Sequence, residues 1–102
     1  MSFASQVVFV TGGGSGMGRL AARRMADAGA KVAAVDVNEA GLAETAEGRE
    51  GIHTWRIDVT DNQAVLATVK EVEDRLGPID RVYNAAAIMS TGLLMEQDTA
   101  TI

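Results

Sequence analysis

The stretch TGGGSGMGR, Thr11 to Arg19, decides how this chain folds, because it places five glycines directly after a short apolar run. That run, Val7 to Val10, is too short for a helix and rich in Val and Phe, as is typical of a strand buried on both faces. Each ordered glycine costs about 0.5–1 kcal/mol of extra conformational entropy. The cluster therefore needs a reason, and the candidates are a tight turn, a bulge, a flexible linker and a phosphate cradle.

Beyond the glycines, helical and extended patterns alternate along the chain. Apolar residues at helical spacing predict a helix over 17–28, with Leu20, Ala21, Met25 and Ala28 on one face and Gly29 at its end. Asn38 is a predicted N-cap. The capping-box pattern at residues 60–63 starts a helix that Gly77 and Pro78 end. We expect strands at 6–11, 31–36, 53–58 and 81–86, helices at 17–28, 38–47 and 60–76, and a further helix start after residue 92.

This alternation predicts an α/β fold with a parallel sheet and helical crossovers. Right-handed crossovers in the strand order 3-2-1-4 would put the first two helices on one face of the sheet and the third on the other. We therefore expect the first half of a doubly wound, Rossmann-type parallel sheet, with residues 1–102 as one portion of a single domain.

Composition and charge exclude several classes of protein. The net charge is −5 and no run of Lys or Arg interrupts it, which argues against nucleic-acid binding. Arg23 and Arg24 are the one adjacent basic pair, interpreted as part of a solvated helix face. With no cysteine and a single histidine, His53, a metal site is not expected. The first residues resemble neither a signal peptide nor a membrane anchor, so we expect a cytoplasmic protein.

Glycines between a strand and a helix place backbone N–H groups at the positive end of the helix dipole, which suits a phosphate. The P-loop pattern fails, because Arg19 and Leu20 stand where Lys and Ser or Thr would be required. The general dinucleotide pattern GxGxxG/A is met by Gly16, Gly18 and Ala21, but this pattern alone is weak.

The whole string, Thr11-Gly12-xxx-Gly16-x-Gly18, resembles that of the short-chain dehydrogenase/reductase family, and the resemblance covers the entire chain. In that family the widely spaced glycines form the turn beneath the cofactor pyrophosphate. The resemblance implies cofactor-binding roles for Gly12, Gly14, Ser15, Gly16, Met17, Gly18, Asp36, Val37, Asp58, Val59, Asn84, Ala85 and Ala86.

Three polar residues at strand ends carry this resemblance further. Asp36 ends the second predicted strand, where a Rossmann acid binds the adenosine ribose, although a lone Asp at a strand end is more often a turn or cap residue. Asp58, with Val59, stands where the family surrounds the adenine, at a corner that also needs caps. Asn84-Ala85-Ala86 resembles the family's NNAG element, with Tyr83 for the first Asn and Ala86 for the Gly. His53, Trp55 and Tyr83 are interpreted as packing or surface residues.

Charge predicts NAD rather than NADP as the cofactor. A 2′-phosphate would bring about −1.5 to −2 charges to within a few ångströms of Asp36, a repulsion on the order of 1 to several kcal/mol. Relatives that prefer NADP offset it with a basic residue beside the acid or inside the glycine loop. Here those positions hold Val37 and Ser15.

The catalytic residues of the family are not expected within this chain. The family uses a Ser and a YxxxK pair, but Tyr83, the single tyrosine, is followed four positions later by Ala87. We therefore assign no catalytic residue and expect an inactive portion of a longer, homo-oligomeric (dimeric or tetrameric) enzyme that would interconvert an alcohol and a ketone. The alternatives are a non-catalytic NAD-binding sensor or regulatory module and, more distantly, a methyltransferase, which would need an acid where Val10 and Thr11 stand.

Overall fold

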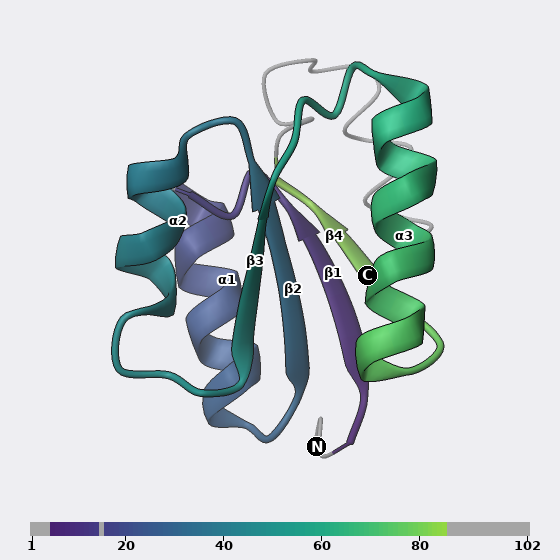
Figure 1. Ribbon diagram of the computed structural model, residues 1–102. Coiled ribbons are helices and arrows are strands. Elements are labelled where there is room, and N and C mark those ends of the chain that lie inside the picture. Colours follow the sequence, from purple (N-terminus) through teal and green to yellow (C-terminus); the bar gives the residue numbers. More distant parts are fainter. Residues whose placement is uncertain (1–4, 15, 86–102) are drawn as a thin grey trace.

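The computed structural model describes residues 5–14 and 16–85 and shows a parallel sheet covered on both faces by helices (Figure 1). The elements follow one another as β1 (Val7–Thr11), α1 (Gly16–Asp27), β2 (Lys31–Asp36), α2 (Glu39–Ala46), β3 (Ile52–Arg56), α3 (Asn62–Leu76) and β4 (Arg81–Asn84). The sheet order is β3-β2-β1-β4 and all three pairings are parallel, which confirms the predicted α/β fold and strand order. The predicted helix start after residue 92 lies outside the described residues.

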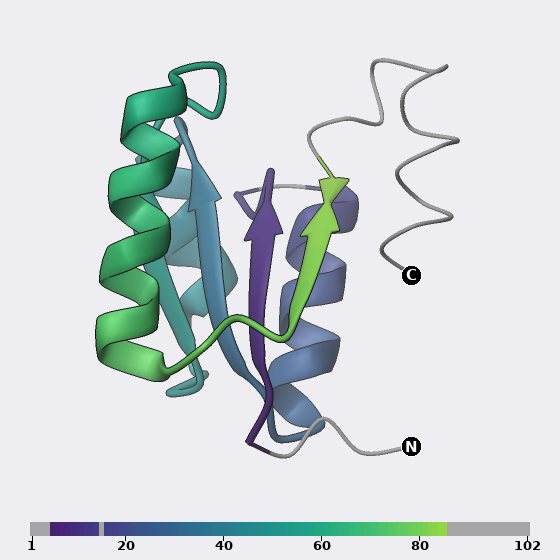
Figure 2. The same cartoon turned by 90° about the vertical axis from the view of Figure 1, so that its right-hand side faces the viewer.

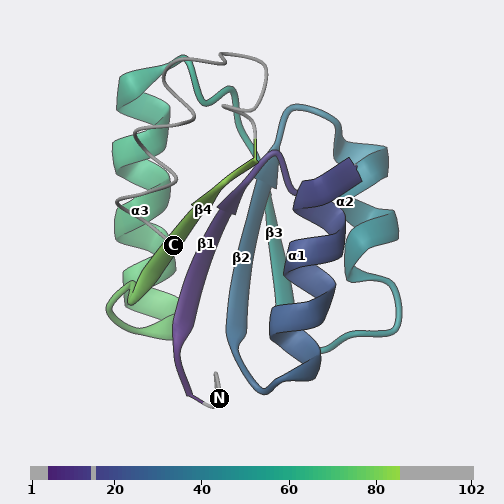
Figure 3. The same ribbon diagram turned by 180° about the vertical axis from the view of Figure 1, so that it is seen from behind.

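The two faces of the sheet are covered as right-handed crossovers require. In the edge view, α3 lies on one side of the strands and α1 on the other, and the view from behind shows α1 and α2 together on one face (Figures 2 and 3). Successive side chains of a strand point to opposite faces, so each face has its own core. The α1 and α2 face buries Val8, Val10, Ala22, Val32, Ala34 and Leu42, and the α3 face buries Val7, Phe9, Ala33, Val35 and Val72.

The ends of the elements follow local chemistry. Asn38 caps α2, its side-chain oxygen accepting a 3.0 Å hydrogen bond from the Gly41 amide, as predicted. The predicted cap at Thr60 is wrong by one residue. Asp61 is the N-cap of α3 and accepts from the amides of Gln63 and Ala64, because the Thr60 hydroxyl is bonded to Asp58 instead. The third strand ends at Arg56 rather than at residue 58.

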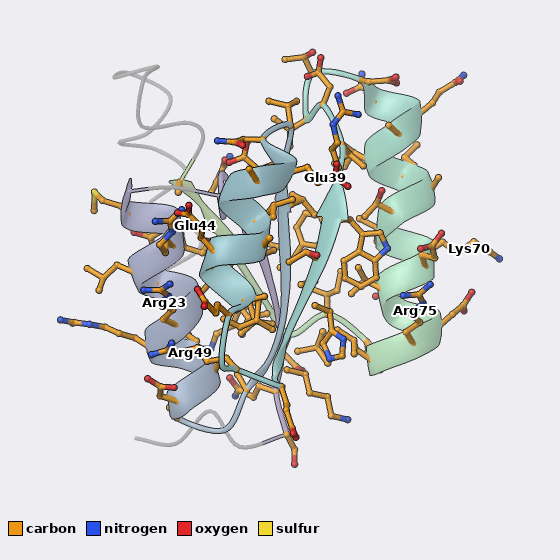
Figure 4. All side chains as sticks on the ribbon, turned by 60° about the vertical axis from the view of Figure 1, so that its left-hand side comes forward. Arg23, Glu39, Glu44, Arg49, Lys70 and Arg75 are labelled. Carbon is orange, nitrogen blue, oxygen red and sulfur yellow. The ribbon has the colours of Figure 1, made fainter. Side chains whose placement is uncertain are left out.

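Two predictions about α1 are corrected by the packing. Leu20 is 51 % exposed, whereas Gly18 and Ala22 are buried, so the face of α1 toward the sheet is rotated from the predicted one. Arg23 is not simply solvated. Its guanidinium donates to the carbonyl oxygens of Glu44 (2.7 Å) and Thr45 (3.3 Å) at the end of α2, the helix beside it in Figure 4. The buried residues of α1, Gly18 and Ala22, are both small, and this allows the helix to pack closely against the sheet.

Trp55 is a packing residue, as the sequence predicted. Its indole N–H donates a 2.6 Å hydrogen bond to Glu71 on α3, and the Arg75 guanidinium lies 5.5 Å from the ring centroid. Arg75 projects from α3 toward β3 in Figure 4. The contact fastens α3 to the edge strand of the sheet by a cation–π interaction.

Candidate dinucleotide site

The glycine loop lies where β1 and β2 end, at the carboxyl edge of the sheet. The Gly13 amide donates a 3.0 Å hydrogen bond to the carbonyl oxygen of Val35, so the loop is tied to the end of the neighbouring strand. A Cβ on Gly18 would collide with the backbone carbonyl of Gly12. This close approach lets α1 begin directly against the turn that follows β1, and only glycine permits it.

Gly16 is required for a different reason. It opens α1 with φ +57°, in the left-handed region that side chains rarely adopt, and a Cβ built on it would meet no atom of another described segment within 4 Å. The space above this residue is therefore open, beside the first turn of a helix whose N–H groups have no partners within the helix. Next along the helix, Met17 is 56 % exposed. Ser15, predicted in the same loop, lies outside the described residues.

Asp36 connects the loop to the end of β2. Its Oδ2 accepts a 2.9 Å hydrogen bond from the Gly14 amide and its Oδ1 a 3.0 Å hydrogen bond from the Asn38 amide. An ionised carboxylate has about four acceptor sites, so these two bonds leave capacity for further donors. The side chain is only partly buried and lines a cleft.

The cleft has a volume of about 180 Å³ and opens at the carboxyl edge of the sheet. Its lining combines one polar edge with apolar walls and comprises Gly12, Asp36, Val37, Ile57, Asp58 and Val59. Five of these residues were predicted from the sequence. Ile57 was missed, although its place in the apolar alternation that continues past β3 was a usable signal. Its amide donates a 3.1 Å hydrogen bond to the carbonyl oxygen of Asp36, which fixes the wall beside the carboxylate.

Asp58 is exposed and holds the turn between β3 and α3. Its Oδ1 accepts from both the Thr60 hydroxyl (2.6 Å) and the Thr60 amide (2.9 Å). The hydroxyl and, to a smaller extent, the amide lower the pKa of the Asp58 carboxyl below its usual value, because both stabilise the ionised form. Asp58 therefore closes the turn and also presents a carboxylate at the mouth of the cleft.

Asn84 ends β4 beside the end of β1. It pairs in register with Thr11, whose hydroxyl donates a 2.5 Å hydrogen bond to Asn84 Oδ1. Ala85 follows and is partly buried, while Ala86 lies outside the described residues. The glycine loop, Asp36 and Asn84 thus gather at one edge of a doubly wound sheet, where such folds bind their ligands.

Comparison with known proteins identifies the family. A family model described as short chain dehydrogenase matches residues 6–102. This chain belongs to the short-chain dehydrogenases. Residues 5–14 and 16–85 include no group of three or more His, Cys, Asp or Glu residues placed to hold a metal ion. In the same ranges, no helix is long and apolar enough to span a membrane.

Named relatives and a solved structure agree with this family. Levodione reductase of Leifsonia aquatica is 43 % identical over 93 residues, covering 84 % of this chain and 34 % of the relative. The 2,3-dihydro-2,3-dihydroxybenzoate dehydrogenase of Bacillus subtilis (strain 168) is 35 % identical, over 87 % of this chain and 36 % of the relative. A crystal structure of a short chain dehydrogenase from Bacillus anthracis superposes with a TM-score of 0.75 at 29 % identity, over 81 % of this chain and 35 % of the other. The chain thus spans about a third of the length of these proteins.

Proposed function

We propose that this chain is the NAD-binding N-terminal portion of a short-chain dehydrogenase, the first half of its Rossmann domain, and that the complete enzyme interconverts an alcohol and a ketone. The observation that carries the proposal is the position of Asp36. Asp36 is the last residue of β2, and its carboxylate accepts a hydrogen bond from the Gly14 amide of the glycine loop. The side chain also lines the cleft and can accept further hydrogen bonds there. The residues of the cleft fit the adenosine half of a nicotinamide dinucleotide, the class of cofactor that this family uses.

Each part of the site has a role in that proposal. The open space at Gly16 and the start of α1 would receive the pyrophosphate, since helix N–H groups and the helix dipole favour an anion. Asp36 would accept hydrogen bonds from the ribose hydroxyls. The apolar side chains of Val37, Ile57 and Val59 would contact the adenine, with Asp58 at its edge. NAD, when bound, supplies the hydride-accepting nicotinamide, which this half of the protein would orient through its adenosine end.

Asn84 and Ala85 would complete the site on the β4 side, with Ser15 and Ala86 beyond the described residues. The bond between the Thr11 hydroxyl and Asn84 holds the two strand ends together at that point. We assign no catalytic role to any of them.

The preference for NAD over NADP is supported by how Arg19 is used. Arg19 follows the last glycine of the loop, but its guanidinium donates to the carbonyl oxygens of Gly14 (2.7 Å) and Gly41 (3.3 Å) and forms a 3.1 Å ion pair with Glu44. A cation committed to these partners would not neutralise a 2′-phosphate. The repulsion between that phosphate and Asp36, on the order of 1 to several kcal/mol, would then decide the preference.

The test is calorimetric titration of NAD and of NADP into the full-length protein and its Asp36→Asn variant. We expect NAD to bind at least tenfold more tightly than NADP, and the difference to shrink in Asp36→Asn. Asp27→Asn is the matched control, because it removes the same charge at the far end of α1, where Asp27 pairs with Arg49. Folded protein that binds neither dinucleotide contradicts the proposal. NAD binding without any dehydrogenase activity in the full-length protein supports the sensor module instead.

A further inference from the structure

A fully buried hydroxyl lies behind the glycine loop. Thr45 of α2 has no exposed surface, and its Oγ1 lies 2.6 Å from the carbonyl oxygen of Gly13 and 3.0 Å from that of Gly41. A hydroxyl has one proton to donate, and the shorter distance favours Gly13 as its acceptor. The Gly13 carbonyl is thereby held toward the protein interior.

Arg19 holds the next carbonyl of the loop in the same way. Its Nη2 donates a 2.7 Å hydrogen bond to Gly14 O, and its Nε donates a 3.1 Å hydrogen bond to Thr45 Oγ1. The same Nη2 also forms the ion pair with Glu44, and the Arg19 side chain is only 27 % exposed. Arg19 and Thr45 therefore form one hydrogen-bonded pair, called here the loop brace.

Helix α2 packs directly against the glycine loop. Gly41 lies so close to the Gly14 carbonyl that a Cβ at position 41 would collide with it. The helix that carries Thr45 is therefore in direct contact with the loop. Glu44, the ion-pair partner of Arg19, projects from α2 beside α1 in Figure 4.

The loop needs such a brace because its residues are glycines. A peptide between glycines can rotate at little steric cost, and rotation would turn a carbonyl oxygen, with its partial negative charge, toward an anion. The loop brace donates hydrogen bonds to the carbonyl oxygens of Gly13 and Gly14. The amides of the same two residues donate to Val35 O and Asp36. A loop fixed before the ligand arrives does not lose affinity to ordering.

We infer that Thr45 and Arg19 are positioning residues for the pyrophosphate of the dinucleotide, acting by holding the Gly13 and Gly14 carbonyls away from it. This inference rests on the proposed function, because it takes the loop to be the pyrophosphate site. It concerns phosphate binding specifically, since neither residue lines the cleft that we assign to adenosine.

The experiment compares ADP, which carries two phosphates, with adenosine, which carries none. In the full-length protein we expect Thr45→Val to weaken ADP and NAD binding by about tenfold while adenosine binding, followed by NMR titration, stays within about twofold. Thr45→Ser, which keeps the hydroxyl, restores ADP binding. Thr68→Val is the matched control, because Thr68 is also buried but lies on α3, against the other face of the sheet. We expect Thr68→Val to leave the affinities for both ADP and adenosine unchanged.

The outcomes separate the two proposals. If the wild-type protein binds neither ADP nor NAD, the proposed function fails. If it binds them but Thr45→Val lowers the affinities for ADP and adenosine equally, or lowers neither, the positioning role is overturned. Should Thr45→Val fail to fold, Arg19→Gln serves as the second variant, because it removes the bond to Gly14 from a partly exposed position. The same selective loss of ADP binding is expected, and its absence overturns the inference.

Discussion

The Gly14 amide donates a 2.9 Å hydrogen bond to Asp36 Oδ2, which joins the glycine loop to the end of β2. Asp36, which we assign to the ribose, therefore also accepts a hydrogen bond from the loop that we assign to the phosphates. The second carboxylate oxygen holds the Asn38 amide at the start of α2. One side chain thus organises the loop, the strand end and the helix start together.

This double role predicts a loss of stability when Asp36 is removed. Asp36→Ala deletes the acceptors of two amides and should lower the free energy of unfolding by about 1–3 kcal/mol, whereas Asp36→Asn, which keeps one oxygen, should cost less. Denaturant unfolding of the full-length variants measures the difference. Hydrogen exchange at the Gly14 amide should accelerate in Asp36→Ala, and unchanged exchange there would show that this bond does not hold the loop.

Gly16 and Gly18 are expected to respond to alanine differently, because the added methyl group meets different surroundings at the two positions. Gly18→Ala puts a methyl group against the Gly12 carbonyl, so we expect a loss of about 3 kcal/mol or more in stability. Gly16→Ala carries the cost of a positive φ, roughly 1–2 kcal/mol, and its methyl group meets no other segment of the part of the chain that the structure describes. Its methyl group would occupy the proposed pyrophosphate position.

Thermal unfolding and NAD titration of the two variants check this pair. Gly16→Ala should remain folded with NAD affinity lowered at least tenfold, and Gly18→Ala should show the lower melting temperature. The reverse order of stability would mean that the close approach of α1 to the loop is not what requires glycine at position 18.

Much of the fold was predictable because each signal was local. Val-rich runs separated by amphipathic segments predicted the alternation, and Asn38 and Gly77 marked helix ends with their own chemistry. The third strand was extended too far because Ile57 and Val59 continue the apolar alternation after the strand has ended and still pack on the core. The alternation of apolar residues does not by itself distinguish residues paired in the sheet from residues that only pack against the core.

The site was predictable where the glycine string or a polar residue at the end of a predicted strand marked it. Asp36 has this signal, but Arg19 and Thr45 do not, because a threonine within a helix becomes an interior hydroxyl only when α1, α2 and the loop meet around it. Leu20 also had helical spacing but is exposed, because α1 buries Gly18 and Ala22 instead. Thr45 was missed because its bonds to Gly13 and Arg19 join residues that are distant in the sequence and carry no shared motif.

The cap of α3 gives a prediction at the other end of the site. Asp61→Ala removes the acceptor for the amides of Gln63 and Ala64, and an N-cap of this kind contributes about 1 kcal/mol to stability. Thr60→Ala leaves that cap intact and should cost less. Chemical denaturation of both variants decides the point, and a larger loss for Thr60→Ala would restore the capping role that the sequence pattern assigned to Thr60.

The titration of Asp58 should report the turn before α3. Thr60→Val removes the hydroxyl that contributes most to lowering the Asp58 pKa but keeps the amide, so the pKa should rise part of the way toward the ordinary value for aspartate. A carboxyl whose pKa is lower in the folded than in the unfolded state stabilises the fold above its unfolded pKa, and this contribution is lost as the pH falls through the folded pKa. The stabilisation of this turn is therefore present at neutral pH and disappears only on the acid side of ordinary aspartate titration.

The measurement is an NMR pH titration of the Asp58 carboxyl carbon in wild type and Thr60→Val. Thr54→Val is the control, because Thr54 is an exposed threonine on β3 and lies outside the turn that Asp58 and Thr60 form. An Asp58 titration that Thr60→Val leaves unmoved would mean that the hydroxyl does not stabilise the carboxylate. The Asp58 carboxylate would then be held in the turn by the Thr60 amide alone, with one bond rather than two.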